Sequence, residues 1–120
     1  ILHCVVSYPT KPNEANLLAI RALKNLDVVV GYSDHTLGIA AAVLSVALGA
    51  RIIEKHFTID NHYSEFRDHQ LSADPQDFKR LTQFVKNTVE LLGVPEKFVQ
   101  SSEKEVLDPV RRSIVAKTRW

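Results

Sequence analysis

The chain has 120 residues, of which 45% are apolar and 24% charged, so it is long enough for one globular domain and is neither disordered nor fibrous in composition. The 15 lysines and arginines against 14 aspartates and glutamates give a net charge of +1, which provides no electrostatic basis for nucleic-acid binding. A single cysteine excludes an internal disulfide framework, and the longest apolar-rich run, residues 37–50, is too short to span a membrane.

The chain begins with a predicted strand and a predicted helix. Residues 1–6 are apolar and rich in β-branched side chains, which is typical of a strand buried on both faces. Pro9 and Pro12 end this strand, and apolar residues at helical spacing over 15–26 predict an amphipathic helix. Because the sequence has no methionine and its first residue already lies in the strand, we expect it to be a piece of a longer chain.

A second strand and helix follow. The run Asp-Val-Val-Val-Gly-Tyr predicts a strand over residues 27–32, which leads into the polar loop 33–36. Residues 37–48 are apolar nearly all round and predict a buried helix. Gly49 is typical of a helix C-terminus, so this second unit ends there.

The third unit has the same order. Residues 51–57 predict a strand, and the polar stretch 58–74 predicts a long loop. A helix is expected over 75–92, because Asp74 precedes it, Pro75 stands at its first position and a glycine follows its last residue.

The repeated order of strand, loop and helix predicts an α/β fold with parallel strands. The strands start 26 and 24 residues apart, close to the roughly 30-residue unit of a TIM barrel, but three βα units cannot close a barrel of eight. We therefore expect a partial TIM barrel over residues 1–93 and a linker segment over 94–120. The open edges of such a sheet allow an alternative, a non-catalytic half-barrel module that binds a partner or assembles with itself.

Residues suited to chemistry gather after the predicted strands. In a parallel α/β sheet, ligands bind at the C-terminal ends of the strands. The residues found there are Ser7 and Tyr8 after the first strand, Ser33, Asp34 and His35 after the second, and Lys55, His56, Asp60, His62, Arg67, Asp68 and His69 at the end of the third strand and in its loop.

His35 and His56 end neighbouring strands of the predicted sheet. Because adjacent strands lie about 4.8 Å apart, the two imidazoles are close enough to share one divalent ion or one anionic oxygen. Two histidines with oxygen ligands suit manganese, iron or zinc. Two histidines are fewer than a closed zinc site needs, so ordinary structural roles for both remain the alternative.

Ser33 and Thr36 bracket the expected start of the helix over 37–48. Free backbone N–H groups at a helix start favour an anion such as phosphate, although plain capping explains these residues equally well. Lys55 lies in an apolar run, where its charge needs a partner. Strand alternation places Glu54 on the side of His56, where it is able to orient the imidazole.

Two further residues have competing interpretations. Tyr8 suits a hydrogen bond to a polyol substrate, or it is a packing aromatic. Asp68 suits a substrate hydroxyl, or it belongs to a solvated loop. From the residues alone, the chain is predicted to carry a metal- and anion-binding face, with no named reaction.

Several strings of the sequence occur together in one order: HCVVSYPT, GYSDHT, IIEKHFTID and RDHQLSADP, with RRSIVAK near the C-terminus. Together they resemble the sialic acid synthase family, the N-acetylneuraminate synthases, including relatives assigned to spore-coat and other surface polysaccharides. The resemblance covers nearly the whole chain. It implies a (β/α)8 barrel followed by an antifreeze-like domain, with this chain as the sixth to eighth units of the barrel.

The resemblance also implies an activity. Enzymes of this family are transferases that condense phosphoenolpyruvate with an N-acyl hexosamine such as N-acetylmannosamine and release phosphate, with Mn²⁺ or Mg²⁺ as the cofactor. It implies a cytoplasmic, homodimeric parent protein without nucleic-acid or membrane partners, and we expect the isolated piece to be inactive. A different phosphoenolpyruvate-using sugar-acid synthase is the enzymatic alternative.

Carried over residue by residue, the resemblance assigns five positions. His35 and His56 match the metal-binding and catalytic histidines of the family. Ser33 matches the serine that contacts phosphoenolpyruvate, and Tyr8 and Asp68 match residues that contact the sugar.

Overall fold

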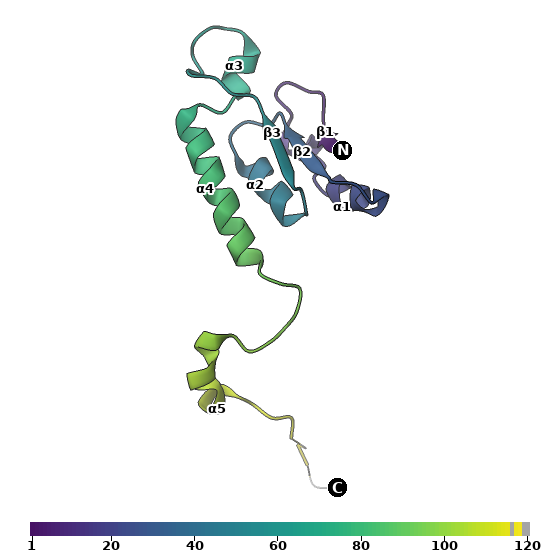
Figure 1. The fold of residues 1–120 in the computed structure, drawn as a ribbon, viewed down its shortest axis with the longest axis vertical. Helices are drawn as coiled ribbons and strands as arrows, with labels where there is room; N and C mark the ends of the chain where they lie inside the picture. The colour runs from purple at the N-terminus through teal and green to yellow at the C-terminus, as the bar shows by residue number, and fades with distance from the viewer. Residues whose placement is uncertain (116, 119–120) are drawn as a thin grey trace.

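A parallel sheet forms the centre of the fold, in the spatial order β1–β2–β3 (Figure 1). The computed structural model describes residues 1–115 and 117–118, apart from the side chain of Arg67. The strands are β1 (Leu2–Cys4), β2 (Gly31–Asp34) and β3 (Ile52–Lys55). This arrangement confirms the predicted α/β class and the parallel strands, although each strand is shorter than expected.

Helical segments connect the strands and follow the third one. They are η1 (Pro12–Glu14), α1 (Ala19–Leu23), η2 (Lys24–Leu26), α2 (Ala40–Ala47), α3 (Arg67–Leu71), α4 (Pro75–Leu92), η3 (Ser101–Val106) and α5 (Leu107–Val110). Helix α2 packs against β2 and α4, and α1 packs against β1. Figure 1 shows α4 running alongside α2. Among the described residues, no helix combines the length and the apolarity needed to cross a membrane.

The hydrophobic core lies between the sheet and its helices. Its buried members are Ile20, Val30, Tyr32 and Ala50, and Leu17, Leu23, Ala41 and Leu48 pack around them. Val30 and Tyr32 lie two residues apart and therefore project from the same face of the sheet. This face is the covered one.

The opposite face of the sheet is open. Residues that are Cα partners in the ladder share a face, so Leu2, Gly31 and Ile52 form one row there and Cys4, Ser33 and Glu54 form the next. The side chain of Ile52 is 51% exposed. A β-carbon placed on Gly31 would lie 2.5 Å from the carbonyl oxygen of Ile52 and 2.5 Å from Leu2 Cδ2, so only glycine fits in the first row.

The second strand differs most from its prediction, which was residues 27–32. Asp27 adopts a left-handed conformation with φ of 53°, and Val28 and Val29 are 46% and 59% exposed. The observed strand begins four residues later and contains buried polar side chains. Of the apolar Val-Val-Val run only Val30 is buried, and the paired strand extends instead into the polar residues Ser33 and Asp34.

Of the three predicted helices, one has its predicted bounds and two are shorter than predicted. The helix expected over 15–26 is broken into a five-residue α1 with short 3₁₀ turns beside it, and the one expected over 37–48 begins at Ala40. Helix α4 has the predicted bounds: Asp74 accepts a hydrogen bond from the backbone N–H of Asp77 at 2.7 Å, Pro75 is its first residue, and Gly93 follows it.

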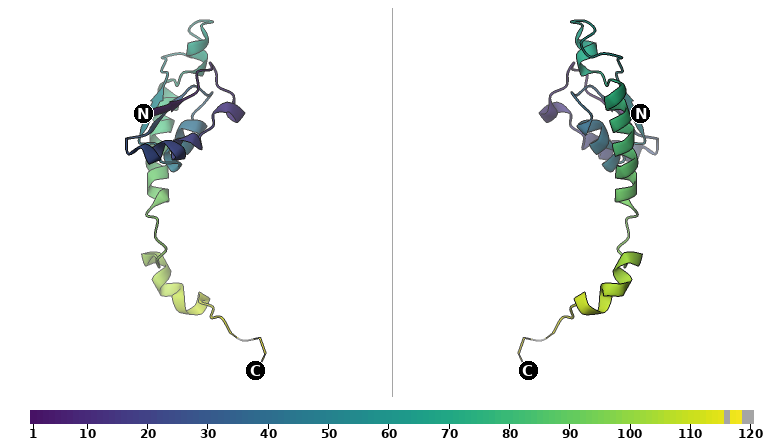
Figure 2. Two further views of the ribbon diagram at one scale, coloured as in Figure 1. Left: turned by 90° about the vertical axis from the view of Figure 1, so that its right-hand side faces the viewer. Right: turned by 90° about the vertical axis from the view of Figure 1, so that its left-hand side faces the viewer.

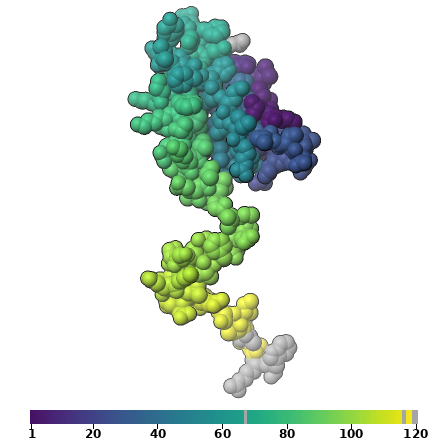
Figure 3. Space-filling view, viewed as in Figure 1, coloured from purple at the N-terminus to yellow at the C-terminus, as the bar shows by residue number. Residues whose placement is uncertain are grey.

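The C-terminal part of the described chain extends away from the sheet. After α4 an extended segment leads to η3 and α5, which lie apart from the body of the molecule (Figures 2 and 3). The N-terminus of η3 has a capping box between Gln100 and Glu103. Val110, Ile114 and Val115 are exposed in this segment.

Replacing Gly31 with alanine tests the close approach of the strands. We expect Gly31→Ala to lower the free energy of unfolding by about 1–3 kcal/mol, because the added methyl group overlaps a backbone atom of β3, which has little room to move. Denaturant unfolding followed by circular dichroism measures the change. The control is Cys4→Ala, which shortens an exposed side chain in the next row and should stay within about 0.5 kcal/mol. An unchanged midpoint for Gly31→Ala would contradict the described packing.

Candidate active site

Three aromatic side chains meet beyond the C-terminal ends of the strands. The ring centres of Tyr8 and His35 are 4.3 Å apart, those of His35 and His56 are 5.3 Å apart, and those of Tyr8 and His56 are 5.7 Å apart. Each residue follows a different strand. The structure therefore brings together three of the five residues singled out from the sequence.

The ring of His35 is held by the segment after β1. Its Nδ1 lies 2.9 Å from the carbonyl oxygen of Val5, and because a carbonyl oxygen only accepts, Nδ1 carries the proton. The carbonyl oxygen of His35 in turn accepts from the backbone N–H of Thr10 at 2.9 Å. The residue is 4% exposed. This arrangement makes Nε2 the nitrogen that can bind an ion.

The spacing of the two imidazoles fits a shared metal ion. Two histidines with a ring nitrogen about 2.1 Å from the same ion have ring centres roughly 5 Å apart, close to the 5.3 Å of His35 and His56. Within the described residues, no group of three or more histidine, cysteine, aspartate or glutamate side chains is placed to hold a metal. A metal ion shared by these two histidines would therefore need further ligands, such as water or substrate, in addition to the side chains described.

Ser33 and Glu54 lie one row below the histidines on the open face. The hydroxyl of Ser33 donates to Glu54 Oε1 at 2.7 Å. By strand alternation, Ser33 shares its face with His35, and Glu54 shares its face with His56. Glu54 was expected to orient His56; the hydrogen bond that the structure gives it is with Ser33.

The predicted helix-start anion site at Ser33 and Thr36 is wrong. Helix α2 begins at Ala40 with Ile39 as its N-cap, so neither residue lies at a helix N-terminus. The backbone N–H and the hydroxyl of Thr36 instead donate to Asp34 Oδ1, at 2.9 and 2.8 Å. Any oxyanion near Ser33 would have to be held by its hydroxyl and not by a helix terminus.

A buried ion pair lies on the other face of the same strand ends. Lys55 Nζ is 3.0 Å from Asp34 Oδ2, and the two side chains are 2% and 0% exposed. Lys55 Nζ also donates to the carbonyl oxygen of Thr36 at 2.9 Å. The sequence indicates that the charge of Lys55 needs a partner, and the structure identifies this partner as Asp34. The sequence does contain a signal for this pairing, because the acid Asp34 and the base Lys55 each directly precede a candidate histidine.

Tyr32 is buried beside this ion pair. Its pKa is raised above the ordinary value of 10.0, first by burial of the phenol and then by the negative charge of Asp34. Its ring also stacks on that of His3, with centres 5.7 Å apart. The phenol is therefore held neutral in the folded state.

The loop after β3 is fastened to the end of that strand. The backbone N–H of Ala73 donates to the carbonyl oxygen of His56 at 2.7 Å, and that of Thr58 donates to the carbonyl oxygen of Ala73 at 3.0 Å. Asp68 lies within this loop on α3, and not at a strand end. His62, also in the loop, has a side chain that is 96% exposed.

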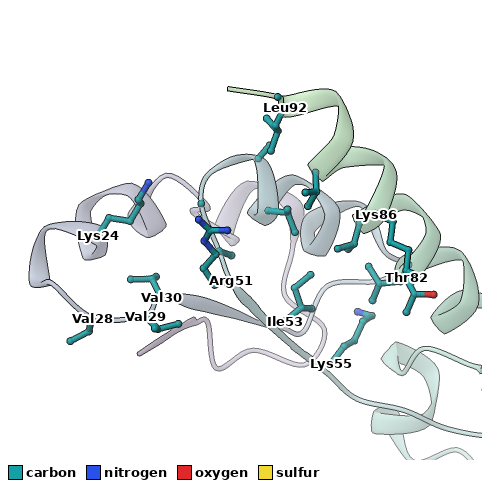
Figure 4. A pocket seen from close by; sticks show the side chains of 18 of the residues that line it. Lys24, Val28, Val29, Val30, Arg51, Ile53, Lys55, Thr82, Lys86 and Leu92 are labelled. Carbon is teal, nitrogen blue, oxygen red and sulfur yellow. The ribbon is translucent and has the colours of Figure 1, made fainter. Parts of the chain in front are cut away.

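A cavity of about 1050 Å³ lies on the helix-facing side, between the sheet and α4 (Figure 4). Apolar side chains such as Ile53, Leu81 and Val85 line it, together with basic residues that include Lys86. Figure 4 shows Ile53 and Lys55 on the side of β3 toward this cavity. None of the five predicted site residues lines it, so it is separate from the ring cluster.

Comparisons with known proteins agree on one family. A sequence model of the NeuB family matches residues 1–97. An uncharacterized protein of Methanocaldococcus jannaschii is 52% identical over 98% of this chain and 35% of its own length. The N,N'-diacetyllegionaminic acid synthase of Campylobacter jejuni is 43% identical over 98% of this chain and 35% of its own length.

Solved structures lead to the same group. The N-acetylneuraminic acid (sialic acid) synthetase of Leptospira borgpetersenii, crystallised with citrate, superimposes with a TM-score of 0.81 and 40% identity, over 93% of this chain and 40% of that one. The chain thus spans about a third of the length of the curated relatives it matches.

The raised pKa of Tyr32 predicts a loss of stability in alkaline solution. Below about pH 10 the phenol is neutral in both the folded and the unfolded chain, so Tyr32 adds no pH dependence. Above that pH only the unfolded chain releases this proton, so stability falls, at most by about 1.4 kcal/mol per pH unit. We expect Tyr32→Phe to show a shallower decline between pH 9 and 11 in urea unfolding. Equal slopes for the two proteins would refute the raised pKa.

Proposed function

This chain belongs to the NeuB family, and from that membership we propose that it is the C-terminal part of the catalytic barrel of a nonulosonic (sialic) acid synthase. The synthase condenses phosphoenolpyruvate with an N-acyl hexosamine, N-acetylmannosamine or a related sugar, for surface carbohydrate biosynthesis. A carbon–carbon bond forms between the methylene carbon of phosphoenolpyruvate and the aldehyde carbon of the sugar, and the bond to phosphate is broken with the consumption of one water molecule, so that phosphate leaves.

The observation that carries this proposal is the meeting of His35 and His56 beside Tyr8, on the same face of the sheet as Ser33. The site lies at the C-terminal ends of parallel strands, where α/β enzymes bind their ligands.

His35 and His56 are the proposed metal ligands and the centre of the catalytic site. A bound Mn²⁺ or Mg²⁺ would supply a Lewis acid that polarises the sugar aldehyde. The hydrogen bond from His35 Nδ1 to the carbonyl oxygen of Val5 keeps Nε2 in the metal-binding form. Neutral imidazole nitrogens beside oxygen ligands suit manganese better than magnesium, which prefers oxygen alone.

The remaining site residues are assigned to the two substrates. Ser33 is assigned to phosphoenolpyruvate, and to bind it the hydroxyl would have to turn from Glu54 Oε1 toward an oxygen of the donor. The hydroxyl of Tyr8 and the carboxylate of Asp68 bind hydroxyl groups of the sugar. The backbone hydrogen bonds of Ala73 with His56 and Thr58 keep the loop that carries Asp68 next to the strand ends.

The open face of the sheet supports placing this chain within a barrel. Helices cover one face, while Ile52 on the other is 51% exposed, as expected for a face that further strands enclose. We assign residues 1–93 to the sixth to eighth βα units and 94–120 to a linker toward a further domain. The parent protein is proposed to be a cytoplasmic homodimer.

Substituting the two histidines tests the metal assignment. In the full-length protein, His35→Ala and His56→Ala should each weaken Mn²⁺ binding, measured by electron paramagnetic resonance of the free ion, and reduce phosphate release at least 100-fold, because one of two imidazole ligands is lost. His62→Ala is the control, since that exposed ring lies outside the cluster. Wild-type Mn²⁺ affinity in both variants would refute these ligands.

Assaying phosphate release from phosphoenolpyruvate tests the reaction itself. The full-length protein with Mn²⁺ should release phosphate with N-acetylmannosamine or a related N-acyl hexosamine. The isolated 120-residue chain should not, because its described residues bring together no group of three or more metal-binding side chains. Turnover with sugars that lack an N-acyl group, and none with N-acyl hexosamines, would favour a different sugar-acid synthase.

The exposed sheet face favours one other candidate, a half-barrel that assembles with itself. Light scattering separates it from the synthase fragment. A stable monomer of the isolated chain counts against assembly, whereas a defined oligomer, with a full-length protein inactive on every N-acyl hexosamine, would replace the synthase proposal.

A further inference from the structure

The last rung of the ladder between β2 and β3 joins the two residues that precede the histidines. Asp34 and Lys55 are Cα partners, and His35 and His56 directly follow them. Because successive side chains alternate between faces, the charged pair projects toward the helices while both imidazoles project to the open face. The pairing of Asp34 with Lys55 therefore determines that His35 and His56 meet on the open face.

Burial makes this rung difficult to change. The Asp34 and Lys55 side chains are 0% and 2% exposed and 3.0 Å apart, and every buried side-chain nitrogen or oxygen among the described residues has a hydrogen-bond partner. A slip of one residue would place a buried carboxylate and a buried ammonium group without partners. The ion pair therefore fixes the register of β2 against β3 where the site begins.

Thr36 extends the same network past His35. Its backbone N–H and hydroxyl donate to Asp34 Oδ1, and its carbonyl oxygen accepts from Lys55 Nζ at 2.9 Å. His35 thus stands between two residues whose polar groups are tied to one buried cluster. The backbone on both sides of its imidazole is held, in addition to the bond from its own ring to Val5.

We propose that Asp34, Lys55 and Thr36 are positioning residues, which hold His35 and His56 at the separation needed to share a divalent ion. This inference rests on the proposed function. None of the three side chains belongs to the ring cluster; they act through the strand ends. Partners that orient metal-binding histidines typically contribute about 10- to 100-fold to metal affinity.

The first test removes one hydrogen bond and leaves the ion pair intact. Thr36→Val keeps the shape of the side chain but cannot donate to Asp34, whereas Thr36→Ser retains the hydroxyl and is the matched control. In the full-length protein we expect Mn²⁺ to bind about 10-fold more weakly to Thr36→Val and nearly as in the wild type to Thr36→Ser. A valine variant with unchanged affinity would overturn the role of Thr36.

The second test removes both charges at once, so that neither is left unpaired. Asp34→Asn combined with Lys55→Met should weaken Mn²⁺ binding by about 10- to 100-fold. Ile20→Val, a core change far from the histidines in sequence, supplies a protein of reduced stability as the control. Equal Mn²⁺ affinity in the double variant and the wild type would overturn the role of the ion pair, and so would an equal loss in Ile20→Val.

A readout without metal separates this inference from the proposed function. Nuclear Overhauser contacts among the rings of Tyr8, His35 and His56, measured in metal-free protein with labelled histidines, should be lost in Thr36→Val and in the double variant but kept in Thr36→Ser and Ile20→Val. If the wild type binds no Mn²⁺, the proposed metal role is wrong, and the ring contacts alone then test the positioning inference. Ring contacts unchanged in every variant would overturn the positioning inference.

Discussion

Alternation of side chains along two parallel strands is the constraint on which this structure depends. At the ends of β2 and β3, each strand has a charged residue followed by a histidine, and the residues are paired across the ladder. The alternation directs the ion pair of Asp34 and Lys55 into the protein and the two imidazoles to the open face. Adjacent residues thus place a buried ion pair on one side of the sheet and the two proposed metal ligands on the other.

The contacts around the rings are also made largely by the main chain. Main-chain groups from the segment after β1 fix His35, through the carbonyl oxygen of Val5 and the N–H of Thr10. Main-chain bonds also tie the loop after β3 to the backbone of His56. Two segments that are distant in sequence, the one after β1 and the loop after β3, are therefore held at the strand ends by main-chain groups.

The sequence allowed the layout of the fold to be predicted, and much less of its detail. Strand and helix order follows from hydrophobic periodicity, and α4 followed from the capping pattern at Asp74 and Pro75. The second strand was misplaced because Ser33 and Asp34 are polar, and only their partners in space make them compatible with burial. Convergence of Tyr8, His35 and His56 was predictable from strand ends, whereas the pairing of Asp34 with Lys55 required the observed register. Asp68 lies in the loop after β3, and the contacts of this loop cannot be predicted from hydrophobic periodicity.

The carbonyl group that accepts the hydrogen bond from the imidazole of His35 belongs to the main chain of Val5. Every amino acid carries such a group, so exchanging the side chain at that position does not delete the acceptor. A substitution at position 5 that leaves the backbone in place therefore keeps this acceptor, and with it the tautomer of the neighbouring histidine.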